Sequence, residues 1–132
     1  MRARLVILAA LALTGCRDDE TLTAYGAGDM VWHLAEIDGA PFEDRAIITF
    51  DASGAVNGEG PCNTFTATQT APYPWFRVED LAVTRRACPA LSAEAVFLTA
   101  LQKMTLVEAV SDIMILRNDA NREMVFRARP SE

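Results

Sequence analysis

Residues 91–104 read LSAEAVFLTALQKM, with apolar residues three and four positions apart. That spacing predicts one amphipathic helix over these residues. We expect Ser92 to be its N-cap and Glu94 to lie in its first turn, where the helix dipole favours a carboxylate. The predicted apolar face consists of Leu91, Ala95, Phe97, Leu98, Leu101 and Met104.

On both sides of this segment the chain alternates short β-type runs with turn signals such as Asp38-Gly39. The predicted strands are residues 31–37, 46–50, 55–58, 64–69, 76–78, 81–84, 105–110, 113–117 and 123–127. Because the apolar face of the helix must be covered, and only a sheet can cover it, the pattern predicts an α+β domain that is mainly antiparallel β. We expect a curved, barrel-like sheet of about eight short strands wrapped around one amphipathic helix.

The first sixteen residues have the three parts of an export signal. Arg2 and Arg4 precede an apolar run over residues 5–13, which is too short to cross a bilayer of about 30 Å as a helix. The run ends in Leu13-Thr14-Gly15-Cys16, which resembles the lipobox of bacterial lipoproteins. The resemblance implies a diacylglycerol on the Cys16 thiol and removal of residues 1–15. An ordinary signal peptide, or a short anchor that happens to carry a cysteine, is the alternative.

The expected organisation is a signal peptide over residues 1–15, a lipidated flexible tether over residues 16–29 and a folded domain over residues 30–128. The tether is predicted because this stretch is polar, contains two glycines and shows no apolar period. Lipid on Cys16 would hold the protein to a membrane. Arg17, rather than the aspartate that often retains lipoproteins of enteric bacteria in the inner membrane, favours the periplasmic face of the outer membrane.

The charge of the chain argues against nucleic acid as a partner. The full sequence has 12 Lys and Arg residues against 18 Asp and Glu residues. Loss of Arg2 and Arg4 with the signal leaves ten basic residues and a formal charge of about −8. Such a surface repels nucleic acid and offers no polybasic patch to a membrane. A mature chain of about 117 residues is enough for one domain.

Three cysteines divide into Cys16, which is assigned to lipid, and the pair Cys62 and Cys88. In an oxidising compartment we expect Cys62 and Cys88 to form a disulfide. Two buried thiols that never meet are one alternative. A redox pair is the other, although redox cysteines are typically close together as Cys-x-x-Cys.

Five short motifs occur along the chain: Trp32-x-Leu34-x-x-Ile37-Asp38-Gly39, Ile48-x-Phe50, Gly58-x-Gly60-x-Cys62-Asn63-x-Phe65, Thr84-Arg85-x-Ala87-Cys88 and Glu94-x-x-Phe97. In this order they resemble the META domain, in the subgroup of HslJ-like bacterial lipoproteins. The resemblance covers residues 30–126. It implies a curved antiparallel sheet around one helix, a connection with heat shock and envelope stress, and no established enzymatic activity.

The remaining polar residues offer few sites. Asn63, Thr84 and Arg85 lie next to the two cysteines and form a candidate polar patch for a small ligand or a partner. The alternative is structural: asparagine closes a turn and arginine satisfies carbonyls or a carboxylate. His33, the single histidine, follows Trp32 in a strand, so we expect it to face solvent.

The stretch Pro72-Tyr73-Pro74-Trp75-Phe76 could be an exposed docking loop, or its rings could fold over a sheet edge. The carboxylate pairs Glu43-Asp44 and Glu79-Asp80 are expected on a solvated surface.

We therefore expect a non-enzymatic, lipid-anchored envelope protein whose domain binds an envelope protein or a small ligand. We expect no catalytic residues, no metal site and no cofactor. One alternative is an envelope enzyme, such as a hydrolase, with an unrecognised site; a purely structural role at the cell wall is another. An enzyme should have a concave cleft in which titratable groups converge. A concave face filled by the helix would remove most of the support for an enzyme.

Overall fold

The computed structural model describes residue 15 and residues 18–130. Cys16 and the predicted signal peptide up to residue 14 lie outside the described residues, so the lipidation stays a prediction. The elements are η1 (Leu22–Tyr25), β1 (Met30–Ile37), β2 (Ala40–Pro41), β3 (Ile47–Phe50), β4 (Ala55–Glu59), β5 (Thr64–Thr68), β6 (Glu79–Val83), α1 (Leu91–Lys103), β7 (Leu106–Val110), β8 (Ile113–Arg117) and β9 (Glu123–Pro130).

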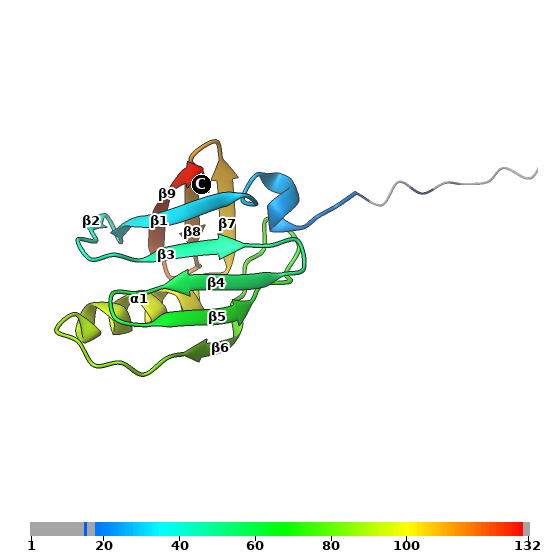
Figure 1. Ribbon diagram of the computed structural model, residues 1–132. Coiled ribbons are helices and arrows are strands. Elements are labelled where there is room, and N and C mark those ends of the chain that lie inside the picture. The colour runs from blue at the N-terminus through cyan, green and yellow to red at the C-terminus, as the bar shows by residue number, and fades with distance from the viewer. Residues whose placement is uncertain (1–14, 16–17, 131–132) are drawn as a thin grey trace, which may run out of the picture.

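The strands form one antiparallel sheet in the order β6-β5-β4-β3-β1-β9-β8-β7, with the short β2 paired to β1. β1 pairs with β9 along nearly its whole length, and the register shifts between Leu34 and Glu36. The sheet curls at this central pair, so that β3–β6 and β7–β9 form two arms that run in different directions (Figure 1). The predicted curved antiparallel sheet is confirmed.

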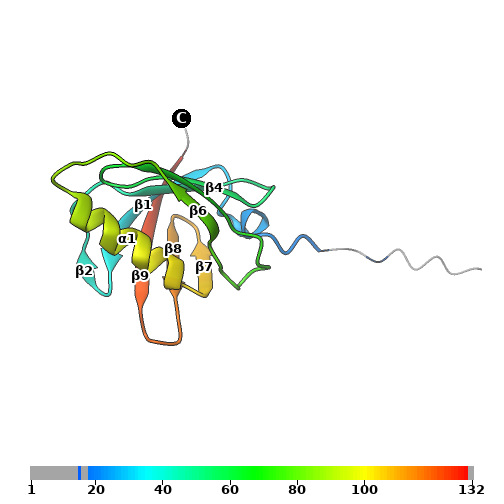
Figure 2. The same ribbon diagram turned by 90° about the horizontal axis from the view of Figure 1, so that it is seen from below.

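Helix α1 lies between the two arms and fills the concave side of the half-barrel (Figure 2). Phe97 and Leu101 are fully buried in the core, where Phe97 packs edge-on against Phe65 with ring centroids 5.7 Å apart. The sheet supplies the other large, fully buried side chains of this core: Trp32, Ile48, Val56, Met114, Leu116, Met124 and Phe126. Burial of this apolar area is the main force that holds the helix inside the sheet.

The predicted apolar face of the helix is right in part: Phe97, Leu101 and Met104 are buried and Leu98 packs against the core, but Leu91 and Ala95 do not. Its buried residues are Glu94, Phe97, Ala100 and Leu101, whereas Leu91 is 47% exposed and Ala95 is also exposed. The predicted cap is wrong, because Ala90 occupies the N-cap and no side chain caps the helix. Phe97, the largest side chain of the helix, points into the core. Glu94 lies three residues before it on the same side of the helix, so it also points inward.

The strand predicted over residues 76–78 does not form. The N–H of Phe76 donates to Thr105 O at 2.9 Å, the N–H of Val107 donates to Pro74 O at 2.8 Å, and Trp75 forms a bridge with Leu106. The backbone of this segment therefore pairs with the start of β7 and covers that edge of the sheet. β6 begins only at Glu79.

The N-terminal part of the domain begins earlier than predicted. Leu22 and Ala27 are buried, and the indole N–H of Trp32 donates to Ala27 O at 3.0 Å. Gly26, with φ 98°, ends η1 and returns the chain toward the sheet. Residues from about 21 onward therefore pack on the domain and are not a flexible tether. The packing of this segment could not be predicted, because a single short 3₁₀ turn has no repeating apolar pattern in the sequence.

Candidate functional site

The disulfide between Cys62 and Cys88 is present, as predicted, with the two Cα atoms 5.8 Å apart. Cys62 lies in the loop between β4 and β5, and Cys88 lies in the segment that leads into α1. The bond therefore joins the β3–β6 arm of the sheet to the start of the helix. Around it the structure brings together residues from three separate parts of the chain.

Glu94 is the centre of this arrangement, although the sequence predicted it only as a first-turn carboxylate. Its Oε2 atom accepts hydrogen bonds from the N–H groups of Cys62 at 2.8 Å and Asn63 at 2.7 Å. Its Oε1 atom accepts from Asn63 Nδ2 at 2.6 Å. A Cβ atom on Gly60 would lie 2.7 Å from Glu94 Oε2, so a glycine is needed where the loop passes the carboxylate.

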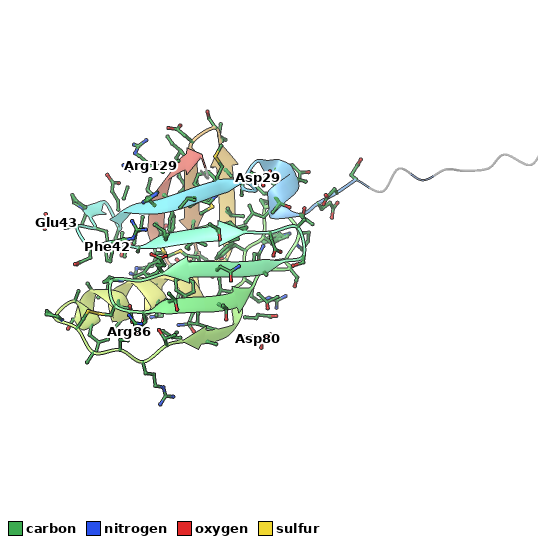
Figure 3. The ribbon with its side chains drawn as sticks, viewed as in Figure 1. Asp29, Phe42, Glu43, Asp80, Arg86 and Arg129 are labelled. Atoms are coloured by element: carbon green, nitrogen blue, oxygen red, sulfur yellow. A yellow bond between two sulfur atoms is a disulfide. The ribbon has the colours of Figure 1, made fainter. Side chains whose placement is uncertain are left out.

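Asn63 and Thr84, two members of the predicted polar patch, do come together, but Asn63 faces inward. Its Oδ1 atom accepts from Thr84 Oγ1 at 3.0 Å and from the Arg86 N–H at 2.6 Å. Its Nδ2 atom also donates to Arg86 O at 3.2 Å, and the segment that carries Arg86 lies beside α1 (Figure 3). We call Cys62, Asn63, Thr84, Arg86 and Glu94 the Glu94 network.

Hydrogen bonding within the Glu94 network keeps the carboxylate ionised. Burial by itself would raise the pKa of Glu94, but the hydrogen bonds from the Asn63 side chain and from the N–H groups of Cys62 and Asn63 outweigh burial and lower it. Asn63 is only 5% exposed, and both polar atoms of its side chain already have hydrogen-bond partners. The network therefore leaves few hydrogen-bonding groups for a ligand. The geometry thus favours the structural interpretation of Asn63 and Thr84.

Arg85, the third member of the predicted patch, stands apart from the network. It is exposed and makes no hydrogen bond or ion pair within the described part of the chain. A hollow of about 180 Å³ borders the network on the outside. It is lined by Glu59, Gly60, Cys62, Asn63, Thr64, Thr84 and Arg86.

A larger open groove of about 620 Å³ lies on the outer face of β3–β6. Its lining mixes polar residues with apolar surface: Ile47, Thr49, Asn57, Gly58, Glu59, Thr64, Phe65, Thr66, Ala82, Val83 and Thr84. Glu59 is the titratable member of this lining, and it forms an ion pair with Arg45 at 3.3 Å. Threonine hydroxyls and an asparagine amide can hydrogen-bond a polar ligand, but they do not form a nucleophile–base pair.

The other candidate residues line neither hollow, although His33 on β1 pairs with Ile47 at the edge of the groove. His33 is half-buried; burial, followed by the charges of Arg129 and Arg45, lowers its pKa and keeps the imidazole neutral near neutral pH. Glu43 and Asp80 lie at opposite ends of the molecule, so the two carboxylate pairs do not meet (Figure 3). Among the described residues, no group of three or more His, Cys, Asp or Glu side chains is placed to hold a metal ion.

Comparison with known proteins gives a family and a fold. The family model described as META domain matches residues 21–131, a range that begins where the chain packs onto the sheet. No curated protein sequence matches the chain. A DUF4847-family protein from Bacteroides vulgatus has a similar structure, with a TM-score of 0.66 and 15% identity over 83% of this chain and 98% of that one.

A protein from Burkholderia xenovorans, whose structure was determined by NMR, is also similar. Its TM-score is 0.64 and its identity 20%, over 94% of this chain and 99% of that chain. Another NMR structure has a TM-score of 0.63 and 17% identity, over 81% of this chain and 95% of that chain. At these identities the likeness establishes a shared fold.

Proposed function

The chain belongs to the META domain family, and from this premise we propose that it is a non-enzymatic, lipid-anchored protein of the bacterial cell envelope. In this proposal the domain acts as a binding or interaction module in envelope stress. Lipid on Cys16 holds it at the membrane, on the periplasmic face of the outer membrane. The partner is an envelope protein or a small polar ligand.

The observation that carries the proposal is the filled concave face of the sheet. In many curved sheets that face encloses the ligand or the reacting groups. Here Phe97, Leu101 and Met104 of the helical segment occupy it and are 0–2% exposed. An open groove lies instead on the outer face of β3–β6, and it contains one carboxylate, which is already paired. Such a surface supports binding better than catalysis, because catalysis needs several titratable groups at one place.

The proposed anchor rests on the sequence around Cys16 and on where the described chain first contacts the domain. The Tyr73 N–H donates to Glu20 O at 2.8 Å, so the chain contacts the domain four residues after Cys16. Within the described residues no helix is long and apolar enough to cross a membrane. Attachment through lipid needs no such helix, since two or three acyl chains hold a protein stably.

The anchor is tested by labelling cells with a fatty acid and comparing the wild type with Cys16→Ala. We expect label on the wild type and an unlabelled, unprocessed precursor for Cys16→Ala. Separation of inner and outer membranes should place the labelled protein in the outer-membrane fraction. Label on Cys16→Ala would overturn the lipid assignment.

The interaction is tested with a photo-crosslinking residue at Thr66, inside the groove, and a matched one at Gln102, which is exposed on α1. We expect crosslinked products in intact cells from position 66 and few or none from position 102. Equal products from both positions would contradict a specific groove. A hydrolytic activity of the purified protein that is lost in Glu59→Gln would favour the enzyme instead.

A further inference from the structure

A strip of aromatic and apolar side chains lies exposed at one end of the domain. It consists of Tyr25, Tyr73, Trp75 and Leu106, and we call it the aromatic strip. Tyr25 is 46% exposed, Trp75 58% and Leu106 37%. The rings of Tyr25 and Tyr73 stack with centroids 4.1 Å apart, and the backbones of Trp75 and Leu106 form an antiparallel bridge. Tyr73 is half-buried, and with Leu106 it lines a groove of about 320 Å³ that also contains Glu108 and Arg117. Tyr73 therefore lies between Tyr25 on one side and the edge of β7 on the other.

This strip lies where the chain enters the domain from its N-terminal side. Tyr73 of the strip donates its N–H to Glu20 O, and Tyr25 belongs to η1, the first element of the domain. In Figures 1 and 2 the described chain before η1 leaves the molecule on the side where the loop between β5 and β6 lies. Cys16 precedes Glu20 by four residues, and four extended residues span at most about 14 Å.

A short anchor of this kind fixes which end of the domain meets the bilayer. A lipid on Cys16 would hold Glu20, and with it Tyr73, within about 14 Å of the membrane surface. Tyrosine and tryptophan favour the headgroup region, because their rings are apolar while the O–H and N–H groups stay hydrated. The aromatic strip therefore has side chains that favour the headgroup region, and it lies at the end of the molecule that the lipid would hold near the membrane.

Charge at the same end selects the kind of membrane surface. Between Cys16 and the strip, Arg17 is outnumbered by Asp18, Asp19 and Glu20, so the segment has a net charge of −2 and would be repelled by an anionic surface. A zwitterionic leaflet imposes no such cost. Once the lipid has inserted, the strip is held at a high effective concentration at the surface, so weak insertion of a few rings is enough to orient the domain.

Resting on the lipid anchor of the proposed function, we propose that the aromatic strip inserts into the interfacial region of a zwitterionic bilayer and holds the domain in one orientation on the membrane. Trp75 is the residue that penetrates deepest in this arrangement, because it is the most exposed ring of the strip.

The two tryptophans of the chain allow a direct test. Trp75 belongs to the strip, whereas Trp32 is 0% exposed and serves as an internal reference. The lipidated protein is reconstituted into vesicles of phosphatidylcholine and phosphatidylethanolamine that contain lipids brominated near the headgroup. We expect the Trp75 component of the fluorescence to be lost in the wild type. We expect Trp75→Phe, which keeps only Trp32, to show no quenching.

A matched control moves the reporter away from the strip. Val96 on α1 is 54% exposed, close to the exposure of Trp75, so the double variant Trp75→Phe, Val96→Trp carries an equally exposed tryptophan elsewhere. We expect it to remain unquenched. Flotation of the same vesicles in a density gradient measures membrane attachment through the lipid, independently of the fluorescence. Protein that floats with an unquenched Trp75 overturns the insertion alone, whereas protein that does not float overturns the anchor and the insertion together.

Discussion

Glu94 of α1 and Asn63 of the loop between β4 and β5 are joined twice: Oε1 accepts from the Asn63 side chain at 2.6 Å and Oε2 from the Asn63 N–H at 2.7 Å. The two residues are 31 positions apart in the chain. The disulfide from Cys62 to Cys88 ties the same loop to the segment before the helix. The central helix is thus fixed to the sheet by a carboxylate and a covalent bond as well as by its apolar face.

Replacing Glu94 with Gln should destabilise the domain by about 1–3 kcal/mol, the cost of leaving a buried donor without its acceptor. The new amide can present one acceptor oxygen, while three N–H donors converge on the carboxylate. Urea unfolding at neutral pH measures the loss. The matched control is Glu108→Gln, whose side chain is 60% exposed and whose loss should stay within about 0.5 kcal/mol. Equal midpoints for Glu94→Gln and the wild type would refute the role of the network.

The contribution of Glu94 should disappear in acid. Its pKa in the folded protein lies below the ordinary value of 4.5, so the unfolded chain takes up the proton first as the pH falls. The stabilisation is therefore fully present above 4.5 and is lost as the pH falls through the lower, folded-state pKa. The difference in unfolding free energy between wild type and Glu94→Gln should shrink between neutral pH and about pH 3. A difference that stays constant over this range would contradict ionisation of Glu94 as its source.

The sheet could be predicted from the sequence because its turns are marked by local chemistry. Asp38 and Gly39 both have positive φ, 50° and 78°, as a tight hairpin turn requires, and Asp-Gly is a strong signal for such a turn. The helix could be predicted because its apolar residues repeat. The disulfide followed from the number of cysteines once one was assigned to lipid.

The exposure of Leu91 and Ala95 and the burial of Glu94 could not be predicted by the same means. Leu91 and Val96 are exposed while Phe97 is buried, so the apolar residues extend beyond the buried face, and their spacing does not show which of them the sheet covers. In the sequence, Glu94 is indistinguishable from an exposed carboxylate in a first helical turn. Two of its partners are backbone N–H groups of a distant loop, which any residue type could supply. Gly60 is the one sequence feature that pointed to the contact, because a glycine in that loop leaves room for the Glu94 carboxylate to approach the backbone.

Substitution of Gly58 by Ala should be costly because Phe65 lies over it. The two residues are directly opposed on β4 and β5, and an added Cβ would collide with the Phe65 ring and come within 2.7 Å of Ile47 O. Overpacking of this kind costs about 1–3 kcal/mol, and we expect a lower melting temperature. The neighbouring Asn57→Ala, on the exposed face of the same strand, should have little effect. A Gly58→Ala protein as stable as Asn57→Ala would show that the Phe65 ring moves aside freely.

Removal of the disulfide should destabilise the domain only where the disulfide can form. Closing the loop from Cys62 to Cys88 removes conformational freedom from the unfolded chain, by the chain-entropy relation about 3.5 kcal/mol. Cys88→Ala should lower the melting temperature under oxidising conditions. Under reducing conditions the wild type loses the same constraint, so the two proteins should then melt nearly together. An equal difference in both conditions would assign the effect to packing of the half-buried Cys88 side chain. Two thiols that react with an alkylating agent in the oxidised, unfolded wild type would show that the bond is absent.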